Sequence, residues 1–180
     1  MARLPILVAP DPRLKVKAET VEKVDADIRQ LMDDMLETMY DANGIGLAAP
    51  QVGVKKRVLV MDIAREGEDP NPIRMANPEI VWASDDEAPH EEGCLSLPQH
   101  YADVTRPLAV KVRYLDRDGE VREMDASGLL AVCIQHEMDH LDGVLFVDHI
   151  SAIKRGMILR KLTKAKKSGK ISVHGDDESF

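Results

Sequence analysis

The sequence from residue 135 to residue 140 reads Gln-His-Glu-Met-Asp-His. On an α-helix the side chains of His136 and His140 lie on one face, a turn apart, where both can bind one metal ion. Glu137 can lie beside such an ion without binding it and transfer protons for a bound water molecule. The stretch therefore predicts a helix that carries a metal site.

The flanking residues predict a buried helix that extends to about Leu141. Ser127 is a candidate N-cap, and Gly143 follows the last expected helical residue. Residues 129–134 are continuously apolar.

The rest of the chain predicts two more helices and several strands. Apolar spacing predicts a helix over 25–41, with Asp25 as N-cap and Asn43-Gly44 at its end. The expected strands are 57–63, 74–83, 108–115 and 120–125. The last expected helix is the basic segment 151–166. A turn at 116–119 joins the last two strands as a hairpin. This order indicates an α+β fold, with 1–168 as a single domain and 169–180 as a mobile C-terminal tail.

The composition is that of a globular protein, with 44% hydrophobic and 31% charged residues. The longest apolar run, 129–134, is far shorter than the roughly 20 residues that span a bilayer. The N-terminus resembles neither a signal peptide nor a transit peptide. We therefore expect a cytoplasmic protein without membrane association.

The net charge of −8 hides a basic segment at 151–170, which contains eight Lys and Arg residues and no acidic residue. Such a segment favours contact with an anionic surface such as RNA. A solvated helix that lies against the acidic body of the protein is an equally good interpretation.

Two histidines need a third partner, because catalytic zinc-type sites use three protein ligands and one open position. One class of metalloproteases places a histidine where this chain has Phe146, and another uses a downstream Glu, for which the chain offers only Glu178. Asp148 and His149 are weak substitutes. An ordinary endopeptidase therefore lacks a good third ligand.

Cys94 can fill that role. It follows Gly93 among polar residues, and its thiolate would favour Fe(II), Zn, Co or Ni. A lone cysteine is also often a small buried core residue, so the local sequence leaves both interpretations open. Cys133 lies inside the apolar run and is expected in the core, where it can form part of a pocket wall.

Three segments together closely resemble the peptide deformylase family. They read Gly-Ile-Gly-Leu-Ala-Ala-Pro-Gln at 44–51, Glu-Gly-Cys-Leu-Ser at 92–96 and Gln-His-Glu-Met-Asp-His-Leu at 135–141. All three motifs of the family are complete and in its order, which is far more specific than any one of them.

The resemblance implies an α+β fold in which antiparallel sheets surround a central motif helix, with an N-terminal and a C-terminal helix. It implies hydrolysis of the N-formyl group of nascent polypeptides that begin with formyl-methionine. Cys94, His136 and His140 would be the metal ligands. The metal would be Fe(II) in the cell, with Zn, Ni or Co as substitutes.

The resemblance also assigns the remaining site residues. Glu137 would be the general base, while the Gln51 amide and the Leu95 backbone N–H would stabilise the oxyanion. The residues expected to bind the substrate methionine and the adjoining peptide are Ile45, Gly46, Leu129, Val132, Cys133 and Tyr101. Tyr101 occupies a position that is basic in some relatives. Asp139 would either orient a ligand histidine or be a solvated helix residue.

The C-terminal helix of bacterial relatives docks on the ribosome near the peptide exit, and the basic segment 151–170 fits that role. The family habit is a monomer. Two rival hypotheses are a metalloendopeptidase and a catalytically inactive, ribosome-associated metal protein. The second would require damage to Glu137, Gln51 or a ligand, and the sequence shows none.

Overall fold

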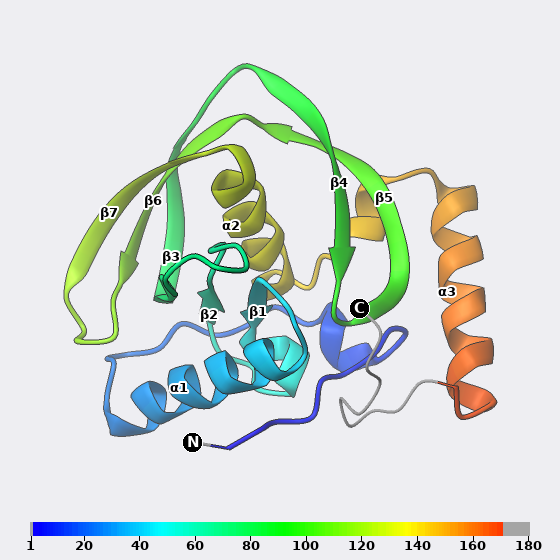
Figure 1. The fold of residues 1–180 in the computed structure, drawn as a ribbon, viewed down its shortest axis with the longest axis horizontal. Helices are drawn as coiled ribbons and strands as arrows, with labels where there is room; N and C mark the ends of the chain where they lie inside the picture. The colour runs from blue at the N-terminus through cyan, green and yellow to red at the C-terminus, as the bar shows by residue number, and fades with distance from the viewer. Residues whose placement is uncertain (1, 171–180) are drawn as a thin grey trace.

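A computed structural model describes residues 2–170 of the chain (Figure 1). The helices are α1 (Ala26–Asp41), α2 (Gly128–Leu141) and α3 (Ala152–Lys167). The strands are β1 (Gly46–Ala48), β2 (Val58–Met61), β3 (Ile73–Ala83), β4 (Glu87–Cys94), β5 (Leu97–Pro107), β6 (Ala109–Leu115) and β7 (Val121–Ser127). Short 3-10 helices are η1 (Pro12–Lys15), η2 (Ala49–Val52) and η3 (Phe146–His149).

The strands form two antiparallel sheets. One has five strands in the order β1-β2-β3-β6-β7, and the other is the two-stranded β4–β5 ribbon. In Figure 1, α2 lies between β3, β6 and β7 on one side and the ribbon on the other. The expected α+β fold, with antiparallel sheets around the motif helix, is confirmed.

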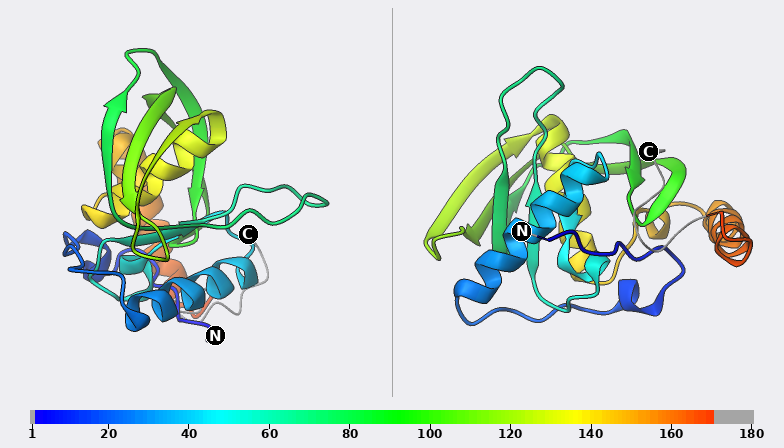
Figure 2. Two further views of the ribbon diagram at one scale, coloured as in Figure 1. Left: turned by 90° about the vertical axis from the view of Figure 1, so that its left-hand side faces the viewer. Right: turned by 60° about the horizontal axis from the view of Figure 1, so that its bottom comes forward.

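Strand β2 is buried on both faces because a helix covers each of them. Val58 and Val60 pack in a core with α1, whereas Leu59 and Met61 pack in a second core with α2. Alternate residues of a strand point to opposite faces, so this continuous apolar run separates the two helices. Figure 2 (left) shows α1 below these strands and α2 above them.

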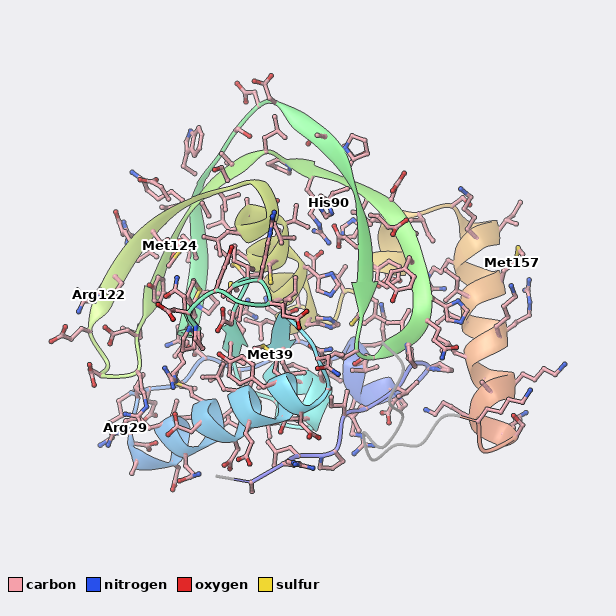
Figure 3. The ribbon with its side chains drawn as sticks, viewed as in Figure 1. Arg29, Met39, His90, Arg122, Met124 and Met157 are labelled. Carbon is pink, nitrogen blue, oxygen red and sulfur yellow. The ribbon has the colours of Figure 1, made fainter. Side chains whose placement is uncertain are left out.

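Helix α1 follows the predicted pattern closely. The Asp25 side chain accepts a hydrogen bond from the Ile28 N–H, as an N-cap does, and the buried stripe includes Met32, Met35 and Met39. Figure 3 shows Met39 projecting from α1 toward the sheet. Ser127 also occupies the N-cap position of α2, but its side chain makes no capping hydrogen bond.

The end of α2 is fixed against the N-terminal segment. The Leu141 carbonyl accepts hydrogen bonds from the Ala18 N–H at 2.7 Å and from Arg57 at 3.0 Å. Gly143 has φ +75, and a Cβ there would lie 2.6 Å from the Lys15 carbonyl. Glycine therefore meets both the conformational and the steric requirement of this turn.

The ribbon strands β4 and β5 and the short β1 were not predicted as strands. The outer face of the ribbon carries Glu87, Glu91 and Asp103, all exposed, so the run lacks the apolar alternation typical of a strand. The predicted strands at 57–63, 74–83, 108–115 and 120–125 correspond to β2, β3, β6 and β7.

Helix α3 confirms the predicted C-terminal helix, and Gly169 and Lys170 close its last turn. Residues 171–180, most of the expected tail, lie outside the described part of the chain. No helix within residues 2–170 has the length and apolar character needed to cross a membrane.

We expect Met35→Ala to lower the free energy of unfolding by about 2–5 kcal/mol, because Met35 is fully buried between α1 and the sheet. Urea denaturation measures the change. Gln30→Ala, on the exposed face of the same helix, should cost less than about 0.5 kcal/mol. Equal effects of the two substitutions would contradict this packing of α1.

Candidate metal centre

Cys94, at the end of β4, meets the two histidines of α2. One ligand atom from each of Cys94, His136 and His140 lies within 4.8 Å of the other two. The Cys94 Sγ is 3.3 Å from the His140 Nε2, and the two imidazole rings meet edge to face with centroids 5.0 Å apart. The structure thus brings together the three residues predicted to be ligands.

This donor set fits a divalent transition metal. A thiolate and two imidazoles leave a fourth position open, as catalytic sites require. Burial lowers the pKa of His140, which favours the neutral imidazole that binds metals. Burial also opposes a charge on His136, but hydrogen bonds with Cys94 and Glu92 outweigh it and raise the pKa of His136. The centre therefore attracts a positive charge.

The predicted weak substitutes for the third ligand lie elsewhere. The Asp148 carboxylate pairs with Lys15 and Arg155, and the His149 Nε2 lies 2.8 Å from Asp139. Neither Asp148 nor His149 belongs to the cluster of ligand atoms. Both are wrong as ligand candidates because η3 directs them toward other charged groups.

Glu92 and Arg106 are site residues that sequence reasoning missed. The Glu92 Oε1 accepts a hydrogen bond from the His136 Nδ1 at 2.9 Å, which leaves Nε2 for a metal. Arg106 donates to both Glu92 oxygens, at 2.6 and 2.9 Å. Burial opposes the charge on Glu92, but these hydrogen bonds lower its pKa to about 2. The sequence signal for Glu92 is its place in the second motif. Arg106 lies outside the three motifs and carries no such signal.

Asp139 does not contact a ligand histidine. Its Oδ2 accepts hydrogen bonds from the Arg106 Nη1 at 2.9 Å and from His149 at 2.8 Å. Asp139 is therefore not simply a solvated helix residue, and it is connected to the ligand His136 only through Arg106 and Glu92.

Glu137 is buried beside the ligands, and burial raises its pKa to about 7. Its Oε2 has no hydrogen-bond partner among the described residues, although buried carboxylate oxygens are normally paired. A Cβ at Gly46 would lie 2.6 Å from the Glu137 Oε1 and 3.0 Å from the Cys133 Sγ. Gly46 is thus needed to make room for the Glu137 carboxylate.

The Gln51 side chain is held in one orientation. Its Oε1 accepts from the Ala48 N–H at 2.9 Å, so its amide nitrogen must point the other way. That Nε2 donates to the Ser96 Oγ at 3.1 Å and lies 3.4 Å from the Cys94 Sγ. The amide N–H groups therefore face the metal centre.

A pocket of about 260 Å³ opens beside the centre. Every predicted site residue except the buried His140 lines it: Ile45, Gly46, Gln51, Cys94, Leu95, Tyr101, Leu129, Val132, Cys133, His136 and Glu137. Tyr101, Ile45 and Leu129 are 55%, 44% and 38% exposed, whereas Cys133 and Glu137 are buried. Figure 3 shows His90, which also lines the pocket, projecting from β4 toward α2.

Comparison with known proteins supports one family throughout. A peptide deformylase of Phenylobacterium zucineum is 62% identical over 168 residues, which are 93% of this chain and 99% of that protein. One from Agrobacterium fabrum is 55% identical over 91% of this chain and 96% of its own length.

Solved structures agree with these sequences. The crystal structure of peptide deformylase from Ehrlichia chaffeensis matches with a TM-score of 0.90 and 42% identity, over 94% of this chain and all of that one. The same organism's enzyme in complex with actinonin matches with a TM-score of 0.89, 44% identity and coverage of 93% and 99%.

The family model for polypeptide deformylase matches residues 3–156, which include all three motifs and the metal centre. These findings favour neither an endopeptidase nor an inactive metal protein. The chain belongs to the polypeptide deformylase family, the metal-dependent hydrolases that remove the N-formyl group from nascent polypeptides.

Proposed function

We propose that Cys94, His136 and His140 hold the metal ion of this deformylase, and that the ion is Fe(II) in the cell. Zn, Ni or Co can take its place, because a thiolate with two imidazoles binds all of these metals. When bound, the ion supplies a positive charge that polarises the formyl carbonyl and lowers the pKa of water. The convergence of the three ligand atoms on one side of the pocket supports this assignment.

Glu137 is the group that moves protons. It takes a proton from the attacking water while the water oxygen bonds to the formyl carbon. It then gives a proton to the leaving nitrogen as the carbon–nitrogen bond breaks, which yields formate and a free amine. A carboxyl group with a pKa of about 7 is suited to both transfers near neutral pH.

Gln51 and Leu95 stabilise the negative charge that develops on the formyl oxygen. The Gln51 amide is fixed before substrate arrives, by Ala48 on its oxygen and Ser96 on its nitrogen. Its remaining N–H, which faces the Cys94 Sγ, is the donor to the formyl oxygen. The Leu95 backbone N–H, which directly follows the Cys94 ligand, is the second donor.

The pocket wall selects methionine. Ile45, Leu129, Val132 and Cys133 line the pocket and offer an apolar site for the thioether side chain. Burial of a methionine side chain stabilises the complex by about 1.5–3 kcal/mol. Gly46 and Tyr101 flank the path of the following peptide, which pairs with the chain as an added strand.

The single observation that carries the proposal is that one pocket contains the proton-transfer group, the amide donor and two of the three proposed metal ligands, Cys94 and His136. Glu137, Gln51 and Cys94 come from α2, η2 and β4, which are distant in sequence. A structural role alone does not explain a buried carboxylate oxygen without a partner at the same place.

We further propose that α3 contacts ribosomal RNA near the peptide exit and that the protein acts as a monomer. Arg160, Lys164 and Lys167 share one groove on α3 and are exposed. A row of exposed cations along one helix suits a phosphate backbone. The cytoplasmic location stays a prediction.

Glu137→Gln should lower kcat for formate release from a formyl-Met peptide by about 10²–10⁴-fold, because the amide cannot transfer the proton. Metal content, measured on the same sample, should stay the same. Glu123→Gln, an exposed change on β7, is the matched control. Retention of full activity in Glu137→Gln would remove Glu137 from the mechanism.

Gly46→Ala should lower kcat by about 100-fold, because the new methyl group displaces the Glu137 carboxylate from its position. Steady-state kinetics with the same peptide measures this effect. Gly156→Ala is the control, since its methyl group meets only the mobile end of the Arg160 side chain. Normal kcat in Gly46→Ala would show that the position of Glu137 is not critical.

Replacing Arg160, Lys164 and Lys167 together by Gln should weaken ribosome binding by at least about tenfold and reduce its salt dependence. Formate release from a short free peptide should not change. Lys111, Arg113 and Arg122, replaced together by Gln on β6 and β7, give the same change in net charge. Equal ribosome affinity of both triple variants would contradict the role of α3.

A further inference from the structure

A line of hydrogen-bonded polar side chains connects the metal centre to the protein surface. It runs from His136 through Glu92, Arg106 and Asp139 to His149, with each neighbouring pair within 2.9 Å. We propose that Arg106 is a positioning residue for the metal centre. It keeps the Cys94 ligand and the histidine ligands at the right positions relative to one another. This inference rests on the proposed ligand role of His136.

The ligands come from two elements that Arg106 joins. Cys94 belongs to β4 of the ribbon, whereas His136 and His140 belong to α2. Arg106, on β5, binds Glu92 of β4 through Nε and Nη2, and Asp139 of α2 through Nη1. All three guanidinium nitrogens form hydrogen bonds. Glu92, Arg106 and Asp139, which we call the clamp, thus connect α2 to the ribbon at two points of the helix, His136 and Asp139.

The inner half of the clamp sets the orientation of His136. The Glu92 Oε1 accepts hydrogen bonds from both the Arg106 Nη2 and the His136 Nδ1, each at 2.9 Å. The Glu92 and Arg106 side chains are only 3% and 7% exposed. With both of its oxygens held, the Glu92 carboxylate cannot rotate, and the His136 ring keeps its Nε2 directed at the metal position.

The outer half of the clamp, the hydrogen bond from Arg106 to Asp139, fixes the orientation of the guanidinium group. A guanidinium next to a single carboxylate can reorient, but Asp139 holds the third nitrogen of Arg106. The same Asp139 oxygen accepts from His149, a 37% exposed side chain on η3. Lysine could supply the charge of Arg106 but not its fork, since an ammonium group cannot span two carboxylates in a plane.

The clamp needs a positively charged residue at position 106, and a neutral side chain that only packs would not be enough. Inside the wall the Glu92 carboxylate is paired with Arg106 through both of its oxygens, and an isolated buried carboxylate is strongly destabilising. Arg106 compensates this charge and lets Glu92 act on His136 as a carboxylate, which makes the imidazole a stronger ligand. A neutral amide at position 92 would keep the hydrogen bond but lose this effect.

The test compares Arg106→Lys and Arg106→Met with the double variant Arg106→Met/Glu92→Gln. Zinc affinity is measured by competition with a chromophoric chelator, and ligand geometry by the absorption bands of the Co(II) protein. Urea denaturation of the metal-free protein gives stability. Arg106→Lys should weaken zinc binding about 10–100-fold and shift the Co(II) bands.

The double variant separates positioning from folding. Removing both charges should restore much of the stability that Arg106→Met alone loses, because no unpaired buried charge remains. Zinc affinity should stay low, since the clamp and the charge on Glu92 are gone. Recovery of zinc affinity together with stability would reduce Arg106 to a structural residue and overturn the inference.

Two further variants complete the experiment. Gln135→Met removes another α2–β5 contact, the hydrogen bond from Nε2 to the Pro107 carbonyl at 3.1 Å. The hydrogen bonds of the Gln135 amide nitrogen go to backbone carbonyls and not to a ligand side chain or a carboxylate of the clamp. It should lower stability without weakening zinc binding; a zinc defect like that of Arg106→Lys would overturn the inference. His136→Ala should lose most zinc affinity. Unchanged zinc binding in His136→Ala would instead overturn the proposed ligand assignment.

Discussion

The meeting of Cys94 with two histidines of a buried helix is the constraint on which the rest of the structure depends. The Cys94 Sγ lies 3.3 Å from the His140 Nε2, although the two residues belong to different elements. The five-stranded sheet and the ribbon enclose α2 from two sides, and the ribbon carries Cys94 to the histidines of the helix (Figure 1). Glycine at position 46 leaves room for the Glu137 carboxylate of α2, and glycine at position 143 leaves room for the Lys15 backbone. The pocket lies where the ribbon and β1 leave room beside α2.

Two glutamates beside the centre have different roles because their surroundings shift their pKa values in opposite directions. Glu92 has a pKa of about 2, because hydrogen bonds from Arg106 and His136 outweigh its burial. Glu137 is buried without a comparable partner, and its pKa rises to about 7. A carboxyl group that stays charged can hold a ligand, whereas one that titrates near neutral pH can move protons. A structural carboxylate and a proton-transfer group thus follow from the same residue type within one site.

Local patterns in the sequence predicted the three α-helices, four strands of the five-stranded sheet and the two histidines of the metal centre, whereas Cys94 was assigned through the family resemblance. The apolar stripe of α1 and the one-turn spacing of His136 and His140 are examples. The ribbon strands were missed because their exposed face is acidic and lacks apolar alternation. Arg106 was missed for a different reason: its role depends on contacts with residues 14 and 33 positions away. Such partners follow only from the tertiary fold, and the same applies to the steric need for glycine at position 46 beside Glu137.

Formate release from a formyl-Met-Ala-Ser peptide tests the central claim most directly. Protein purified without oxygen is compared after loading with Fe(II), after loading with zinc and after chelator treatment, with the unformylated peptide as a control for endopeptidase activity. The account predicts that Fe(II)-loaded protein releases formate, that chelator-treated protein does not, and that the unformylated peptide stays intact. Cleavage of the unformylated peptide, or no formate from protein that has bound Fe(II), would contradict it.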